Sequence, residues 1–317
     1  MLPFNSFSEP ARRVSQGQLQ ALLSIYQQDS LTGIVQLTPV QSTGEFFVLL
    51  YVEGKLFRLY QHLSKGYVRH DETHAWNAIL PSKDMDLLSH QFSPRFIRPL
   101  QVIFEAAKTG DTSKVATQAV IEKIQMLEKK PNPLLAHFHW PSADGFALIP
   151  GNGLPSRQLL FWSPNHSSGI PNFTRWPETE CTLATYEVNA ASTAWHENCL
   201  ALGLDYLYEQ IFIRYDELVG SSMVSRLEEQ LNTVSRMQGW KISFTGHTLN
   251  DTHFFSSMSD MRIAYRTLLM SGQRHISSVV GEKLFEESAR AGFISLPPVL
   301  QTTLTKDNVF TYRIPST

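Results

Sequence analysis

The sequence is poor in cysteine. Its only two cysteines, Cys181 and Cys199, lie eighteen positions apart in a chain of 317 residues. Two cysteines in a chain of this size do not form the disulfide framework that small secreted proteins use in place of a large core. We therefore expect two free thiols in a reducing compartment.

Long apolar runs and an export signal are also missing. No run approaches the roughly 18 consecutive apolar residues that a membrane-spanning helix requires. The first residues, MLPFNSFSEPARR, do not place an apolar segment after a basic start, which is the pattern of a secretory signal peptide. We expect a cytoplasmic protein without a membrane span.

Charge is scarce as well. Charged residues make up 18% of the chain, where about a quarter is usual, and the formal net charge is −2. A nucleic-acid-binding protein normally carries a basic excess or a basic face, so we expect no nucleic-acid partner. Hydrophobic residues make up 42%, which is enough for packed cores and argues against a mainly disordered chain.

The most apolar stretch is Gly44–Tyr60, GEFFVLLYVEGKLFRLY. Two apolar runs flank Glu53-Gly54-Lys55, a pattern that predicts a β-hairpin within a covered sheet. Around this hairpin we expect a first α+β domain over residues 15–110. Its other predicted elements are a helix at Gln16–Gln28, a strand at Gly33–Leu37, a surface connection at His62–Asp71, and helices at Asp84–Gln91 and Leu100–Lys108.

A second α+β unit is predicted over residues 111–190. We expect a connector helix over 111–130 and strands at Leu134–Trp140, Gly145–Ile149, Gln158–Trp162 and Cys181–Ala190. A helix, a short strand, a polar loop and two apolar strands follow one another in both units. This shared order leads us to weigh a divergent duplication of residues 15–110 in residues 111–190.

Residues 192–292 read as mostly helical. Apolar spacing predicts helices at Trp195–Val219 and Met223–Gln238, a strand at Trp240–Phe244, and a long helical run at Asp260–Arg290. We interpret this region as a dimerisation or docking element, followed by a tail over 293–317 with a strand at Val309–Arg313. The predicted class is thus α+β: one or two small domains of hairpins and helices, then a mostly helical C-terminal region.

The first domain resembles the PATAN-type domain, which stands at the N-terminus of PatA-like bacterial response regulators. The stretches that carry the resemblance are LQALLSIYQQDSLTGIVQL and FFVLLYVEGKLFRLY, with Thr32-Gly33 and Gly54-Lys55-Leu56 matching the recurring positions. The resemblance covers about residues 15–110. It implies protein–protein contacts in two-component and motility signalling, without a catalytic site. No receiver domain is recognisable in this chain, so any link to phosphorelay is implied through partners alone.

Histidines provide one alternative interpretation. His137-Phe138-His139 places two imidazoles on one face of a strand, and with His166 or His196 they form a candidate metal site for a metal-dependent hydrolase. The HDETH segment at 70–74 has the spacing of a metal-binding helix, but its flanks indicate a polar loop.

Aromatic residues cluster in the second unit. Trp140, Phe161, Trp162 and Trp176 are candidates for an aromatic-lined pocket within residues 134–176. A packed core is the competing explanation for these residues. A pocket would make the protein a small-molecule sensor.

The sequence thus favours a non-enzymatic signalling or scaffold protein. We expect no catalytic residues and no cofactor, a protein partner such as a response regulator, and a homodimer contact through residues 192–292. The sensor and the metal-dependent hydrolase remain as alternatives.

Overall fold

The computed structural model describes residues 11–40, 44–63, 66–71, 76, 77, 79, 84–91, 93–156, 158–162 and 171–311. Contacts divide the chain into two units, Met1–Ser192 and Thr193–Thr317. The first unit contains two antiparallel sheets and the second is mainly helical, which confirms the predicted α+β class.

The first sheet has six antiparallel strands in the order β1-β6-β2-β3-β4-β5. The strands are β1 (Arg12–Ser15), β2 (Gly33–Pro39), β3 (Phe46–Val52), β4 (Lys55–Leu63), β5 (Gly66–His70) and β6 (Asp84–Gln91). Two helices accompany it, α1 (Gln16–Gln28) and α3 (Ile97–Glu105), the second preceded by a 3-10 turn at Pro94–Phe96. The predicted hairpin is therefore present as β3 and β4.

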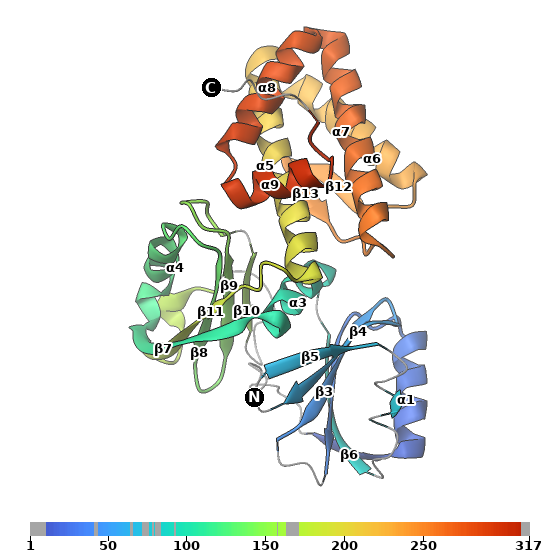
Figure 1. Cartoon of the computed structure of the whole chain (residues 1–317), viewed down its shortest axis with the longest axis vertical. Helices are drawn as coiled ribbons and strands as arrows, with labels where there is room; N and C mark the ends of the chain where they lie inside the picture. The colour runs from blue at the N-terminus through green and yellow to red at the C-terminus, as the bar shows by residue number, and fades with distance from the viewer. Residues whose placement is uncertain are drawn as a thin grey trace. The chain divides into compact units, whose positions relative to one another are not determined.

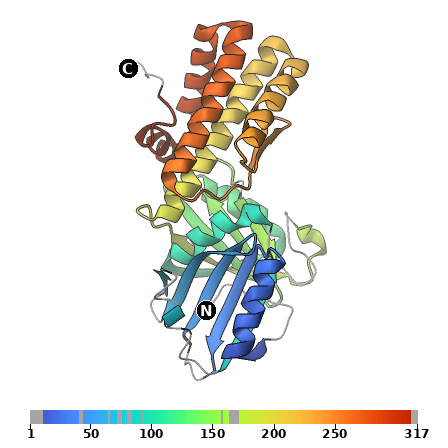
Figure 2. The same ribbon diagram turned by 90° about the vertical axis from the view of Figure 1, so that its right-hand side faces the viewer.

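Both faces of this sheet are covered. Val35, Leu37 and Leu49 belong to the core that Leu19 of α1 enters, and Figures 1 and 2 show α1 lying across that face. On the other side, Tyr60 packs against Phe104 of α3, with ring centroids 5.2 Å apart. This double burial explains why β3 is apolar along its whole length.

The two segments that carry the PATAN resemblance meet at one corner of the sheet. The hydroxyl of Thr32 accepts the Glu53 N–H at 3.0 Å, and the Gly54 N–H donates to the Leu31 carbonyl at 2.8 Å. A Cβ on Gly54 would lie 2.3 Å from the Gln27 carbonyl oxygen. The hairpin turn therefore fits against the end of α1 because residue 54 is glycine.

The second sheet has five antiparallel strands in the order β10-β9-β8-β11-β7. The strands are β7 (Ala107–Ala116), β8 (Leu134–His139), β9 (Asp144–Ile149), β10 (Gln158–Trp162) and β11 (Glu180–Glu187). Helix α4 (Val120–Glu128) covers one face, and 3-10 turns lie at Thr117–Ala119 and Phe173–Arg175.

The two sheets share one topology. Strands β1, β2, β3, β4 and β6 correspond in chain order and sheet position to β7, β8, β9, β10 and β11, and α1 and α4 each precede the second strand of their set. The corner contact also recurs. The Asn152 N–H donates to the Lys130 carbonyl at 2.8 Å and the Gly153 N–H to the Glu128 carbonyl at 2.7 Å, which joins the loop after β9 to the end of α4. Descent of residues 15–110 and 111–190 from one ancestor remains a prediction.

The helical unit is built around α5. Its elements are α5 (Thr193–Val219), α6 (Ser221–Met237), the hairpin β12 (Ile242–Thr245) and β13 (Thr248–Asp251), α7 (Met258–Val280), α8 (Glu282–Ser295) and α9 (Pro298–Lys306). Helix α5 contacts each of the other four helices and β13. Figures 1 and 2 show the long helices side by side.

Two predicted helices of the first unit are wrong. Asp84–Gln91 is strand β6, in which Met85 and Leu87 are buried in alternation and pair with β1 and β2. The connector helix over 111–130 is β7 up to Ala116 and a helix only from Val120. The surface connection at 62–71 is also wrong, because the end of β4 and β5 form a hairpin there.

The tail over 293–317 differs from its prediction. Pro298–Lys306 is helix α9, and the predicted strand is absent from 309–311, the part of that segment that the structure describes. Phe310 instead stacks on Phe293 of α8, with centroids 4.1 Å apart. The predicted run at Asp260–Arg290 is divided into α7 and α8 at Gly281, whose φ is +90°.

Cys181 and Cys199 are both buried free thiols. Burial raises the pKa of Cys181 to about 12, and it raises the pKa of Cys199 as well. Within the described part of the chain, no helix combines the length and the apolar composition needed to cross a bilayer.

Candidate functional site

Strand β8 presents two histidines on one face of the second sheet. Its alternation places Ala136 and Phe138 in the core beside α4, so His137 and His139 point to the opposite face. The imidazole pair predicted from the sequence is therefore formed.

The structure adds a carboxylate to this pair. Asp144 opens β9 and lies directly opposite His139, while Phe146 lies opposite His137. The Asp144 Oδ1 atom is 2.7 Å from His137 Nε2 and 2.9 Å from His139 Nδ1. The side chain of Asp144 is fully buried, that of His137 is 12% exposed and that of His139 is 44% exposed.

Aromatic rings hold the site. The His137 ring stacks on Phe146, with centroids 4.5 Å apart and planes 7° apart. Tyr186 of β11 lies beside it, at 6.5 Å between ring centroids. Burial, and then the charge of Asp144, raise the pKa of Tyr186. The three ligand-type side chains offer two nitrogens and one oxygen within 4.8 Å of one another, which is a donor set for a divalent transition metal.

Asp144 was not among the residues predicted from the sequence. A signal for it was present, because His139 and Asp144 flank the four-residue segment Trp140–Ala143 that carries Pro141. A tight connection between two strands pairs its flanking residues across the hairpin. The other proposed ligands lie elsewhere: His166 is outside the described residues, and His196 is in α5, where it binds Asp307.

The aromatic candidates for a ligand pocket lie on the other face of this sheet. Trp140 and Phe161 are fully buried, Trp176 is half-buried, and all three pack with Phe173 against α4. The side chain of Trp162 is outside the described part of the structure, and ligand binding by these residues remains a prediction. In the HDETH segment, His70 ends β5, and residues 72–75 are not described.

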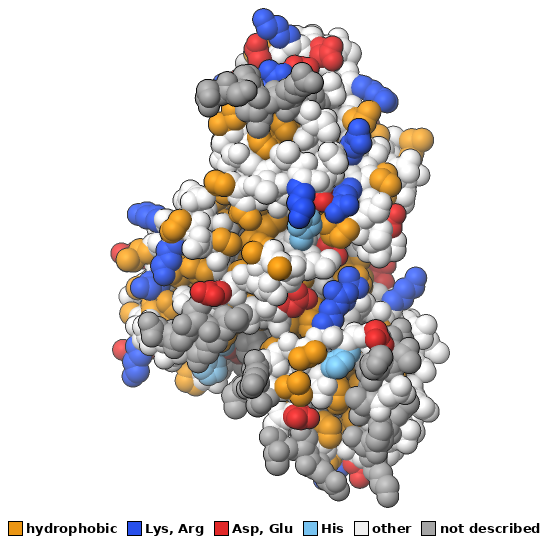
Figure 3. Space-filling model, in the orientation of Figure 1, with side chains coloured by type: hydrophobic (Ala, Val, Ile, Leu, Met, Phe, Trp, Pro, Cys, Tyr) orange, Lys and Arg blue, Asp and Glu red, His pale blue; other side chains and the backbone are white. Residues whose placement is uncertain are grey.

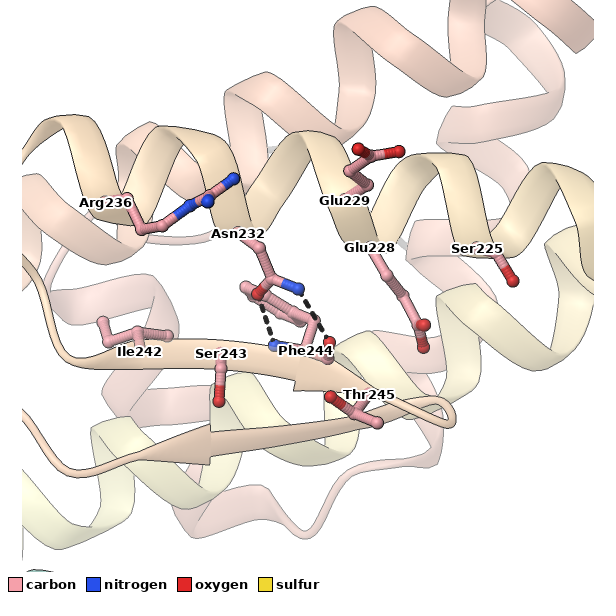
Figure 4. A pocket seen from close by; sticks show the side chains of 9 residues that line it. All are labelled: Ser225, Glu228, Glu229, Asn232, Arg236, Ile242, Ser243, Phe244 and Thr245. Atoms are coloured by element: carbon pink, nitrogen blue, oxygen red, sulfur yellow. Dashed lines mark hydrogen bonds between the residues drawn. The ribbon is translucent and has the colours of Figure 1, made fainter.

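A concave feature lies in the helical unit. A groove of about 530 Å³ runs between α6 and β12, and Figure 4 shows Asn232 reaching across it. The Asn232 side chain accepts the Phe244 N–H at 2.7 Å and donates to the Phe244 carbonyl at 2.9 Å. This side chain thereby replaces the strand that would otherwise pair with the outer edge of β12.

Asn232→Ala is expected to lower the stability of the helical unit by about 1–3 kcal/mol, because both backbone groups of Phe244 lose their partners. Ser225→Ala in the same groove is the matched control, since the one hydrogen bond of the Ser225 hydroxyl within the described part of the chain goes to the Ser221 carbonyl of its own helix. Urea unfolding followed by circular dichroism measures both. Equal midpoints for the two variants would show that Asn232 contributes nothing to holding β12.

Comparison of the chain with protein-family models, with curated proteins and with solved structures finds no match in any of the three. Sequence similarity therefore does not assign a function to either unit.

Proposed function

We propose that the chain is a cytoplasmic signalling or scaffold protein that acts through contacts with another protein, in two-component or motility regulation. The resemblance to PATAN-type domains supports this proposal. The matching segments meet in a single corner at Thr32 and Gly54, and a comparable corner recurs in the second sheet.

The observation that carries the proposal is an exposed stripe on α7. Ile263 is 59% exposed and Met270 is 43% exposed, and seven residues, or two helical turns, separate them on the same face. Arg266 and Arg274 are exposed on that face too. We call these four residues the α7 stripe. Figure 3 shows hydrophobic and basic side chains next to one another over the region where Figure 1 labels α6 and α7.

The chemistry of the α7 stripe favours a protein partner with an apolar ridge and carboxylates beside it. A single exposed apolar residue is ordinary on a protein surface. In the α7 stripe, two apolar side chains and two cations lie along one line, so a partner with a matching row of groups could bind in one orientation. Neither Arg266 nor Arg274 has an ion pair among the described residues. Carboxylates of a partner would form an ion pair with each of the two arginines, and these pairs would set the orientation of the partner on α7.

Affinity capture tests the proposal. The double variant Ile263→Ser, Met270→Ser is expected to lose at least one protein that the unaltered chain retains, by about tenfold or more, since two buried apolar side chains contribute several kcal/mol. Ile294→Ser on α8 is the matched control, because Ile294 is also 59% exposed.

Quantitative mass spectrometry of the three captures gives the comparison, and sedimentation velocity detects a second copy of the chain as the partner. The expected result is a protein, or a self-association, that is kept by the Ile294→Ser variant and lost by the double variant. Identical recoveries and identical sedimentation for all three chains would overturn the proposal.

A further inference from the structure

The shared topology of the two sheets offers an internal comparison for the His137–His139–Asp144 cluster. In β8 and β9, His137 pairs with Phe146, and in β2 and β3, Gln36 pairs with Val48. The positions of the first sheet that correspond to the three cluster residues are Gln36, Thr38 and Phe46. The first sheet thus folds with no imidazole and no carboxylate at these positions, and the fold itself does not require the cluster.

The burial of Asp144 demands a specific reason. A carboxylate without solvent exposure is costly unless cations or hydrogen-bond donors compensate it. Here two ring nitrogens from alternate residues of one strand converge on a single oxygen, Oδ1. The two nitrogens compensate the buried carboxylate, and the same three groups offer a cation two nitrogens and one oxygen.

We propose that His137 Nε2, His139 Nδ1 and the Asp144 carboxylate bind one divalent transition-metal ion, for which Zn²⁺ is the reference ion. Ligands of a tetrahedral zinc site lie at ~2.0–2.1 Å from the metal and therefore at roughly 3.3 Å from one another. The nitrogens now lie 2.7 and 2.9 Å from Asp144 Oδ1, and all three ligand atoms fall within 4.8 Å. Shifts of less than about 1 Å per side chain bring them to coordination distances.

The donor set selects the class of metal. Two imidazoles and one carboxylate suit zinc and its first-row neighbours, whereas calcium and magnesium prefer oxygen donors throughout. The stacking of His137 on Phe146 fixes one ring in advance. Fixed rings lower the conformational cost of binding.

The site has one open side. His139 is 44% exposed, whereas His137 and Asp144 are nearly or fully covered. No fourth histidine, cysteine or acidic side chain joins the group among the described residues. A bound ion therefore keeps a coordination position for water or for an external ligand on the side of His139.

Equilibrium dialysis of the full-length chain against Zn²⁺, after treatment with a chelator, tests the inference. We expect one equivalent of zinc on the unaltered chain and a loss of affinity of at least about 100-fold in His139→Ala, which removes a ligand outright. His247→Ala is the matched control, because His247 also lies beside a carboxylate, at 3.7 Å from Asp216, in the helical unit.

A second variant protects the test against misfolding. Asp144→Asn keeps the shape of the side chain and removes its charge, and it is also expected to weaken zinc binding by at least about 100-fold. Circular dichroism confirms that each variant is folded. Less than a tenth of an equivalent of zinc on the unaltered chain, or the same affinity in His139→Ala as in His247→Ala, would overturn the inference. The α7 stripe variants serve as a further control and should bind zinc normally.

Discussion

Gly54→Ala is expected to destabilise the first sheet by about 2–5 kcal/mol, the sum of a disfavoured backbone conformation and a steric clash. The φ of Gly54 is +78°, in the left-handed region. A Cβ there would lie 2.3 Å from the Gln27 carbonyl oxygen and 2.9 Å from the Gln27 Cα. Both atoms are backbone at the end of α1, so neither can rotate away as a side chain would.

Gly17→Ala is the matched control for this prediction. Gly17 lies within α1, and a Cβ there meets nothing within 4 Å. Alanine is the better helix former, so this variant should be neutral or gain up to about 1 kcal/mol. Urea unfolding of both variants gives the comparison. A Gly54→Ala variant within about 0.5 kcal/mol of the unaltered chain would contradict the close approach of the hairpin to α1.

Asp307→Asn is expected to lower the stability of the helical unit by about 2–3 kcal/mol. Asp307 is the residue that follows the last residue of α9, and its side chain is 1% exposed. It hydrogen-bonds to His196 of α5 and forms an ion pair with Arg262 of α7 at 2.5 Å. Asparagine keeps the volume of the side chain but removes the charge that both partners face. The variant therefore weakens the interactions that connect the end of α9 to α5 and α7.

An exposed pair in the same unit provides the control. Arg214 and Glu217 are 3.4 Å apart, and each side chain is 59% exposed. Solvent screens such a pair, so Glu217→Gln should change stability by no more than about 0.5 kcal/mol. Thermal unfolding compares the two variants. If Asp307→Asn costs no more than Glu217→Gln, the buried carboxylate does not hold α9 in place.

Local patterns were sufficient to predict much of the fold. Helix α1 has the bounds expected from its apolar spacing, and the hairpin of β3 and β4 follows from two apolar runs around Gly54. The strands β8, β9 and β10 were predicted on the same basis. In each case neighbours in sequence are also neighbours in space, so the pattern itself contains the contact.

The failures involve partners that are distant in sequence. Strand β6 pairs with β2, 46–58 residues away, and with β1, 69–75 residues away, and these pairings decide that Met85 and Leu87 lie on one face of a strand. Strand β7 pairs in the same way with β11. A short segment with few apolar residues has no local signal strong enough to reveal such a pairing.

The candidate metal site was predictable in part. The alternation of β8 places His137 and His139 together, and this needs only the period of a strand. The position of Asp144 beside these histidines depends on the register of the β8–β9 hairpin. Its complete burial depends on what covers that face of the sheet. Trp140 and Phe161 are buried on the other face of the sheet. Their burial likewise depends on a distant element, helix α4, which covers that face.

Photo-crosslinking in the cell of origin shows whether the α7 stripe contacts a protein partner. A photoreactive amino acid is placed at Arg266 in one chain and at Ile294 in another, and the adducts are identified by mass spectrometry. We expect an adduct with a protein, or with a second copy of the chain, from position 266 that position 294 does not form. The same adducts from both positions, or none from position 266, would contradict it.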